Sequence, residues 1–279
     1  MALTDRQPEL HVETLPVLSM RQLFNLALGL SLPGNVKILF RQASPNLILA
    51  AGHATHLSLL LLGWRLKVKT VVLMKPSLPT RLFDLCLIPA HDRPPPAENI
   101  IETQGALNPM RAHEKKADTG LILIGGPSKH HAWDEEGLMR QLQNLVSRDA
   151  RQWMLTSSRR TPDTTLKRLK KELQGIKFVP HTETPQGWLA EHLATAEQAW
   201  VTADSVSMVY EALTAGCGVG VLDVPQQAKN RLTQGLQTLV DDGIITFFSR
   251  WTGDKLLKPD RNFDEAGRCA QQILTRGWL

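Results

Sequence analysis

Short apolar runs alternate with amphipathic stretches along almost the whole chain. The runs have the length of buried strands, and the stretches between them have apolar residues at helical spacing. The repeated order of strand, helix and strand predicts an α/β protein built on open parallel sheets. The expected strands cover residues 46–51, 69–74, 83–88, 100–103, 121–124, 153–156, 177–181, 199–201, 219–222 and 244–248. The expected helices include residues 57–66, 134–146, 164–174, 187–195, 206–215 and 263–276.

The first part of the chain is predicted to form a short strand over residues 10–17 and an amphipathic helix over residues 20–32. Leu23, Phe24 and Leu28 recur at helical spacing, which favours packing of this helix against a core. A helix that faces a membrane surface is the alternative interpretation.

Residues 104–118 are polar and charged and contain a proline, which is typical of a linker between two domains. We therefore expect two Rossmann-like domains that face each other across a cleft. The first covers residues 1–112 and the second residues 113–255. The terminal segment, residues 256–279, is expected to be helical and to pack back on the amino-terminal domain.

Residues 201–224 contain the most informative pattern, because a strand, a polar loop, a helix and a second strand follow one another. Ser205 and Ser207 begin the helix, where free N–H groups and the helix dipole favour a phosphate. Asp204 or Ser205 could instead be an ordinary N-cap. Glu211 lies further along the same helix, where its carboxylate could accept two hydrogen bonds from a ribose diol or simply face solvent.

A loop with paired glycines, residues 125–131, follows the strand expected at residues 121–124. Gly125 and Gly126 would let the backbone approach a ligand closely, while Ser128 and Lys129 supply a hydroxyl and a cation. The loop matches neither the P-loop nor the dinucleotide fingerprint. An ordinary tight turn is the alternative.

Residues 157–162 form a further polar loop, which follows the strand expected at residues 153–156. Ser158 and Arg159 would lie at a carboxyl end of the sheet, where Arg159 could bind a phosphate through two parallel hydrogen bonds. A solvated surface arginine is the alternative.

Polar side chains also follow the expected strands of the amino-terminal half. His53, Lys75, His91 and Asp92 all fall at carboxyl ends, where the ligands of open α/β sheets bind. Their spacing matches no compact ligand set, so no metal ion is expected. Nothing in the sequence calls for a cofactor either.

Composition narrows the partners. The 279 residues have 42% hydrophobic content, a net charge of +5 and a pI near 9.2. So mild an excess of positive charge favours anionic ligands or an anionic membrane surface over nucleic acid. No signal peptide is visible, and the apolar run at residues 57–62 is too short to span a membrane. The expected location is cytoplasmic, with peripheral attachment to the inner membrane as an option.

Several motifs stand in a fixed order and together carry a resemblance to a known family. The motifs are PNLILAAG at residues 45–52, FDL at 83–85, PAHD at 89–92, IGGPSK at 124–129, TSSRRTP at 156–162 and VTADSVSM at 201–208. In these motifs the chain resembles the bacterial branch of the mitochondrial-fission ELM protein family over residues 45–250.

That family is in turn similar to GT-B glycosyltransferases, in which the carboxyl-terminal domain holds a nucleotide sugar. The resemblance implies that Glu211 binds the ribose of the donor. It also assigns donor-binding roles to two motifs and to a later pair of amides. The matching residues are Gly125, Gly126 and Ser128, then Ser205, Ser207 and Glu211, then Gln227 and Asn230.

Two departures from the family concern the amino-terminal half. Related chains open with a strand and a glycine-rich loop before the position of residue 10, so this domain is expected to be truncated. The family also has arginine where His53 stands. A catalytic base, if present, is expected to be His53 or Asp92.

The expected function is metal-independent transfer of a sugar from a nucleotide diphosphate to an acceptor, with a lipid-linked acceptor at the inner membrane surface as one option. A non-catalytic scaffold or membrane-peripheral adaptor with the same fold is the main alternative. A nucleotide-sugar epimerase is the second, because it would use the same donor site. No nucleic-acid partner is expected.

Overall fold

The computed structural model describes residues 10–30, 32, 34–39, 45–227 and 231–279. The chain divides into two compact units. The first unit contains residues up to Leu107 together with Glu265–Leu279, and the second contains Asn108–Asp264. No helix in the described ranges is long and apolar enough to cross a membrane.

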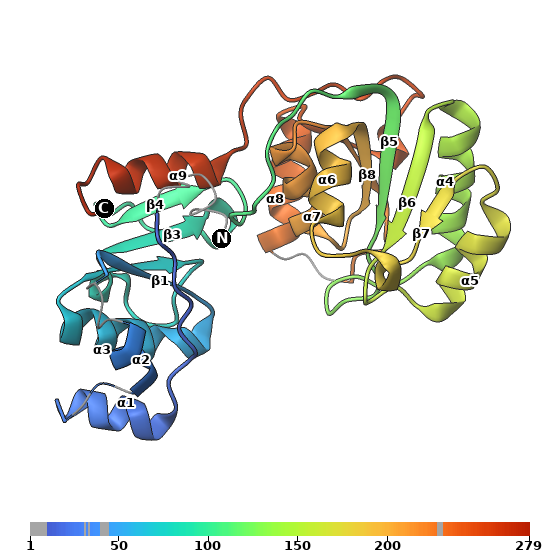
Figure 1. The fold of residues 1–279 in the computed structure, drawn as a ribbon. Helices are drawn as coiled ribbons and strands as arrows, with labels where there is room; N and C mark the ends of the chain where they lie inside the picture. Colours follow the sequence, from blue (N-terminus) through green and yellow to red (C-terminus); the bar gives the residue numbers. More distant parts are fainter. Residues whose placement is uncertain (1–9, 31, 33, 40–44, 228–230) are drawn as a thin grey trace. The chain divides into compact units, whose positions relative to one another are not determined.

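The first unit is built on a four-stranded parallel sheet in the order β1-β2-β3-β4. Helices cover both faces of this sheet (Figure 1). The strands are β1 (Leu47–Ala51), β2 (Lys69–Leu73), β3 (Leu85–Pro89) and β4 (Ile100–Thr103). The helices are α1 (Met20–Ala27), α2 (Gly34–Leu39), α3 (His56–Leu66) and α9 (Glu265–Leu274).

Alternation along the strands explains the two cores of this unit, because successive side chains of a strand point to opposite faces. One face packs on α9 and the other packs on α3. The α9 side is formed by Val71, Leu85, Leu87, Cys269, Ala270 and Ile273. The α3 side is formed by Leu59, Val72, Phe83, Cys86 and Ile88.

The segment before α1 is not a strand, so the prediction for residues 10–17 is wrong. The amide of Leu18, just after it, donates to Ser58 Oγ of α3 rather than to a sheet neighbour. Helix α1 begins with a capping box formed by Ser19 and Gln22. It ends at Ala27, earlier than predicted, because the chain turns through Gly29 at a φ of +69°.

The second unit holds a six-stranded parallel sheet in the order β10-β9-β8-β5-β6-β7. Its strands are β5 (Lys116–Ile124), β6 (Gln152–Ser157), β7 (Lys177–Val179), β8 (Ala196–Thr202), β9 (Gly218–Leu222) and β10 (Ile245–Phe247). Its helices are α4 (Glu135–Arg148), α5 (Asp163–Glu172), α6 (Trp188–Thr195), α7 (Val206–Thr214) and α8 (Arg231–Asp241). The predicted α/β class with two Rossmann-like parallel sheets is confirmed.

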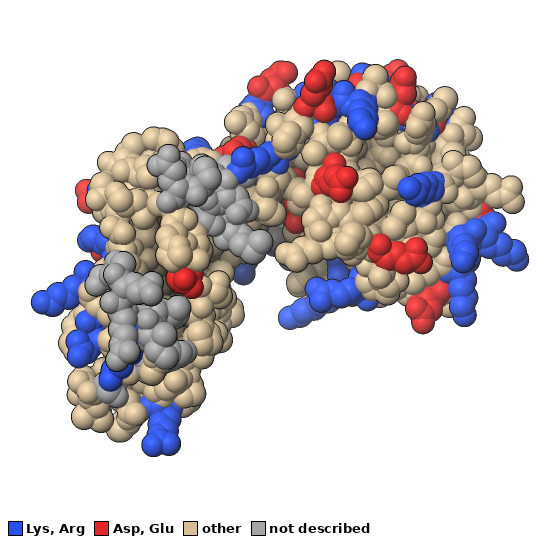
Figure 2. Space-filling view, in the orientation of Figure 1, with Lys and Arg blue, Asp and Glu red and all other residues tan. Residues whose placement is uncertain are grey.

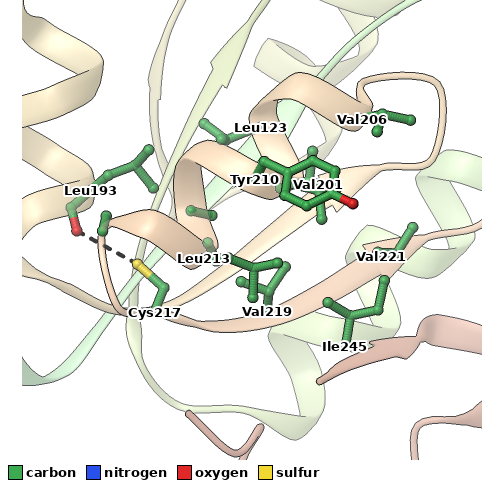
Figure 3. Close-up of a cluster of buried hydrophobic side chains, with 14 of the residues drawn as sticks. Leu123, Leu193, Val201, Val206, Tyr210, Leu213, Cys217, Val219, Val221 and Ile245 are labelled. Carbon is green, nitrogen blue, oxygen red and sulfur yellow. Dashed lines mark hydrogen bonds between the residues drawn. The ribbon is translucent and has the colours of Figure 1, made fainter. Parts of the chain in front are cut away.

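Two clusters of buried side chains hold the second unit together. Helices α6, α7 and α8 cover one face of the sheet, and α4 and α5 cover the other (Figure 1). Figure 3 shows the first cluster, in which side chains of β5, β8, β9 and β10 meet those of α7. The Cys217 thiol donates to the carbonyl of Leu193 at 3.5 Å, at the end of α6.

The packing predicts the effect of a single methyl group in the second sheet. Gly220 of β9 lies against the indole of Trp200, and a Cβ atom there would lie 2.4 to 2.5 Å from three ring carbons. We expect Gly220→Ala to lower the free energy of unfolding by about 1–3 kcal/mol in urea denaturation. Gly34→Ala in α2 is the control, because no described atom lies within 4 Å of its added methyl. Equal losses in the two variants would contradict this packing.

Candidate functional site

The candidate site lies where the strand order of the second sheet reverses. The chain runs outward from β5 through β6 to β7, then returns to β8 on the other side of β5 and continues to β9 and β10. Open α/β sheets bind ligands at the carboxyl ends of the strands beside such a reversal. The loops after β5 and β8 are neighbours there, and the loop after β6 flanks them.

An ion pair joins these three loops. Arg160, after β6, donates from Nη2 to Asp204 Oδ2 at 2.6 Å and to Ser205 Oγ at 3.0 Å. Its Nη1 donates to the carbonyl of Gly126 at 2.9 Å. The amide of Gly126 donates to Asp204 Oδ2 at 3.1 Å. The Asp204 side chain is fully buried, whereas that of Arg160 is 42% exposed.

The paired glycines make room for this ion pair. A Cβ atom on Gly125 would lie 2.2 Å from Asp204 Oδ2, and one on Gly126 would lie 2.1 Å from the carbonyl oxygen of Arg160. A larger residue at either position would therefore separate the loops. The close approach that the sequence suggested for a ligand is thus made by protein groups.

Hydroxyl groups complete the contact between the loops. Thr161 Oγ1 donates to the carbonyl of Gly125 at 2.5 Å and accepts from the amide of Ser158 at 2.9 Å. Thr202, the last residue of β8, accepts from the amide of Gly125 at 2.8 Å. These hydrogen bonds therefore hold together the loops that follow β5, β6 and β8.

The start of α7 has no side-chain cap. Ser205 occupies the N-cap position, but its hydroxyl contacts Asp204 and Arg160 rather than an amide of the first turn. Ser207 in that turn is exposed. The first amides of α7 are therefore available to an anion, and the helix dipole favours one there.

Two exposed cations lie in the same group of loops. Lys129 and Arg159 are both exposed, and neither makes a hydrogen bond or ion pair with any residue that the structure describes. Figure 2 shows Lys and Arg side chains at the end of the second unit where the strands have their carboxyl ends. Arg159 thus remains free for an anionic ligand, while its neighbour Arg160 is held by Asp204.

The polar atoms around Asp204 are not all satisfied. Asp204 Oδ1 is buried and has no hydrogen-bond donor among the described residues. His131, only 5% exposed, lies in the same group of charges. Burial lowers the pKa of His131, and the Asp204 carboxylate opposes that effect. Its Nδ1 lies 3.4 Å from Ser128 Oγ, which also accepts from the amides of His130 and His131.

Glu211 is a half-buried carboxyl on α7, one turn after Ser207. It has no hydrogen-bond or ion-pair partner within the described part of the chain. Burial raises its pKa to about 7, because water can no longer stabilise the charge fully. The Glu211 carboxyl is therefore only partly accessible to solvent. Half-buried carboxyls with shifted pKa values are common at functional sites.

The segment after β9 closes the site on its other side. The amide of Gln227 donates to the carbonyl of His130 at 2.9 Å, and the Gln227 side chain is exposed. This bond ties the segment to the loop that follows β5. Asn230, the other predicted amide, lies outside the described residues.

The two candidate bases lie in the first unit. His53 follows β1 in a short 3-10 turn, and Asp92 follows β3 in another. Both are at the carboxyl edge of the first sheet, with the end of β2 between them. His53 is exposed, whereas His56 is buried and its Nδ1 lies 3.0 Å from Ser77 Oγ.

No group of three or more His, Cys, Asp or Glu side chains in the described ranges is placed to hold a metal ion. The polar groups at the carboxyl ends of the second sheet are instead hydrogen-bond donors, cations and one unpaired carboxyl. Such a set suits an anionic ligand that also carries hydroxyl groups.

Two parallel Rossmann-like units in one chain place the protein in the GT-B class of folds. The chain belongs to the Mitochondrial fission ELM1 family, whose model matches residues 10–277. The family resemblance predicted from the motifs is therefore confirmed.

A curated relative and two solved structures are similar to this chain. RP120, an uncharacterised protein of Rickettsia prowazekii (strain Madrid E), is 24% identical over 255 residues, 74% of this chain and 72% of the relative. UDP-GlcNAc 2-epimerase from Methanocaldococcus jannaschii has a TM-score of 0.52 at 11% identity, covering 99% of this chain and 88% of that one. A putative UDP-N-acetylglucosamine 2-epimerase from Listeria monocytogenes has a TM-score of 0.51 at 10% identity, with 94% and 74% covered. At these identities the two structures establish the fold alone.

Sequence reasoning missed the residues that organise the site, which are Arg160, Thr161, Thr202 and His131. The motif contains two adjacent arginines, and nothing in the sequence shows which of them forms an ion pair. Both arginines lie in a tight turn, in which the amide of Thr161 donates to the carbonyl of Ser158 at 3.1 Å. Only the position of Asp204, in the loop after β8, decides which arginine is held.

The ion pair predicts opposite behaviour for these two arginines. Arg160→Ala leaves the fully buried Asp204 carboxylate without its cation. We expect a loss of about 2–3 kcal/mol in the free energy of unfolding, less than for a fully buried pair because Arg160 is partly exposed. Arg159→Ala is the matched control, with an expected change below about 0.5 kcal/mol. Urea denaturation of both variants tests this, and similar losses would show that the pair does not organise the loops.

Proposed function

We propose that the second unit binds a nucleotide diphosphate sugar and that the protein transfers the sugar to an acceptor. The proposal is carried by α7, which has uncapped amides at its start and the unpaired Glu211 carboxyl further along. These groups complement the two ends of a nucleoside diphosphate, its phosphates and its ribose. The proposal agrees with the UDP-GlcNAc named for both structures with TM-scores above 0.5.

The diphosphate would lie at the start of α7. Amides of the first turn and the hydroxyl of Ser207 donate to one phosphate, while Lys129 and Arg159 neutralise the other. The same groups stabilise the charge that develops on the leaving diphosphate during transfer. In this scheme the helix and the two cations supply the stabilisation, and no metal ion is required.

The ribose would lie beside Glu211. An ionised carboxylate accepts hydrogen bonds from both hydroxyls of a ribose diol, which replaces the water that burial removes from Glu211. Gln227 is exposed and lies on a segment tied to the loop after β5, and we propose that its amide contacts the sugar. Asn230 is the second proposed amide contact. The loops themselves are shaped by Ser128, Ser158 and the paired glycines, which we propose contribute to binding by fixing the backbone around the donor.

Transfer itself needs a base for the acceptor hydroxyl. The acceptor oxygen bonds to the anomeric carbon, the bond from that carbon to the diphosphate breaks, and the acceptor proton passes to the base. We propose His53 for this role, since a neutral imidazole accepts a proton near pH 7, and Asp92 as the second candidate. A lipid-linked acceptor at a membrane surface is the proposed acceptor class.

Glu211 makes binding of the donor depend on pH. Because burial raises its pKa to about 7, and the diol binds the ionised form, affinity should rise as pH increases from 6 to 8. This change in affinity is measured by calorimetry with UDP-GlcNAc. Its phosphates do not titrate between pH 6 and 8, so they do not contribute to the pH dependence. Binding at pH 7 should also release a fraction of a proton, seen as a dependence of the heat on the buffer.

Two glutamine variants control this experiment. Glu211→Gln should abolish the pH dependence and weaken binding, while Glu191→Gln on the exposed face of α6 should change neither. The folded pKa of Glu211 lies above its usual value near 4.5, so its ionisation lowers stability as pH rises between these values. Glu211→Gln should therefore be more stable than the wild type at pH 8, with the difference vanishing at pH 4. A pH-independent affinity in the wild type would contradict the role of Glu211.

Product analysis tests catalysis and separates the alternatives. We expect release of UDP from UDP-GlcNAc with a polyprenyl-linked sugar, which offers a free hydroxyl, as acceptor, and His53→Ala should lower kcat by about 10²–10⁴ with little change in donor affinity. His11→Ala, also exposed, is the control. An isomerised sugar without acceptor would identify an epimerase. Tight UDP binding without turnover in any variant would favour a non-catalytic scaffold and overturn the catalytic proposal.

A further inference from the structure

Exposed apolar side chains are concentrated in one part of the first unit. Among the described residues, twelve large hydrophobic side chains are exposed, and ten of them belong to residues 12–82. The ten are Val12, Val17, Met20, Phe24, Leu28, Leu30, Leu57, Trp64, Met74 and Leu82. Scattered exposed apolar residues need no explanation, but a concentration in a quarter of the chain marks an interaction surface.

Helix α1 is apolar on the side that faces away from the protein. Leu23 and Leu26 are buried against the core of the first unit. Met20, Phe24 and Leu28 are 77%, 65% and 57% exposed, and they follow one another at intervals of four residues on the opposite side. A helix that only covered a core would have polar residues there.

Helix α3 continues this surface. Leu62 of α3 packs in the same buried cluster as Leu23 and Leu26 of α1, so the two helices lie side by side. Trp64 of α3 is 66% exposed and Leu57, two turns earlier, is 49% exposed. We call the exposed side chains Met20, Phe24, Leu28, Leu57 and Trp64 the α1–α3 surface.

The same stretch carries the positive charge of the whole chain. Residues 14–83 contain eight of the 32 Lys and Arg residues and none of the 27 Asp and Glu residues. The remainder therefore has 24 cations against 27 acids. The eight are Arg21, Lys37, Arg41, Arg65, Lys67, Lys69, Lys75 and Arg81. Figure 2 shows Lys and Arg among uncharged side chains at the end of the first unit that carries α1 to α3.

Charge and shape together select the partner. A second copy of the chain would bring cations against cations, which opposes association through this surface. Exposed Phe, Leu and Trp side chains, together with the exposed Arg21 of α1 and Arg65 of α3, suit the interface of an anionic bilayer, where rings enter the headgroup region and cations meet phosphates. We propose that the α1–α3 surface docks the protein on an anionic membrane.

This docking surface extends the proposed function, because it would bring the protein to a lipid-linked acceptor, but its physical basis is independent. The α1–α3 surface belongs to the first unit, whereas the candidate donor site belongs to the second. Vesicle binding is measured without nucleotide, and nucleotide binding is measured without lipid. Failure of one proposal can therefore be told from failure of the other.

Co-sedimentation with vesicles tests the docking surface. The probes are vesicles of phosphatidylcholine alone and of phosphatidylcholine with 30% phosphatidylglycerol, at low and high salt. We expect binding to the anionic vesicles only, weakened by salt. Phe24→Asp and Arg21→Glu should each lower the partition coefficient about tenfold or more. The matched controls Leu257→Asp, at a side chain 79% exposed in the second unit, and Lys170→Glu on α5 should leave it unchanged.

Trp64 supplies a second readout. Its exposed indole should shift its fluorescence to the blue on anionic vesicles, and Trp64→Phe should remove most of that shift. An unchanged circular dichroism spectrum and an unchanged urea midpoint in Phe24→Asp and Arg21→Glu would show that these surface variants are folded. The proposal is overturned if the wild type does not bind anionic vesicles at low salt, or if the control variants lose binding equally. A wild-type dimer that Phe24→Asp converts to a monomer, without vesicle binding, would assign the surface to a second copy instead.

Discussion

The pair formed by Arg160 and Asp204 is the interaction on which the second unit's polar site depends. A carboxylate with no exposed area requires a cation, and Arg160 supplies one while its other donors reach Gly126 and Ser205. One guanidinium thus spans three loops from three strands. Because Ser205 is held in this network, it does not cap α7, and the amides of the first turn stay available. An ion pair that organises the loops also leaves the helix able to bind an anion.

This arrangement concentrates unsatisfied polar groups in one place. Asp204 Oδ1 and the carboxyl of Glu211 lack partners among the described residues, and both belong to the segment that enters or forms α7. Buried polar groups without partners lower stability, so their presence on one helix needs a cause. A ligand that donates hydrogen bonds would satisfy them, and burial then strengthens the interaction instead of opposing it. A site that keeps polar groups unsatisfied for a ligand is expected to lower the stability of the free protein.

Most strands and helices followed from apolar periodicity, because each element buries one face and strand–helix–strand repeats admit few topologies. β4 (Ile100–Thr103) was predicted to the residue. Residues 10–17 were wrong because alternation alone does not supply a neighbouring strand. Within the site, the positions of Ser205 at the start of α7 and of Glu211 within that helix followed from the helix pattern. The distinction between Arg159 and Arg160 did not, since it depends on Asp204, 44 residues further along the chain.

The charge of this protein shows why an average over the chain misleads. A net charge of +5 over 279 residues looks diffuse, and on that basis the sequence offered only a general preference for anions. The structure gives this charge a position, because the stretch without acids also contains the apolar side chains that α1 and α3 expose. Neither feature alone defines a surface: cations without apolar groups stay hydrated, and apolar groups without cations have no preference among partners. Their coincidence distinguishes the exposed surface of the first unit from the polar loops of the second unit, where Arg160 is held by Asp204 while Lys129 and Arg159 have no partner among the described residues.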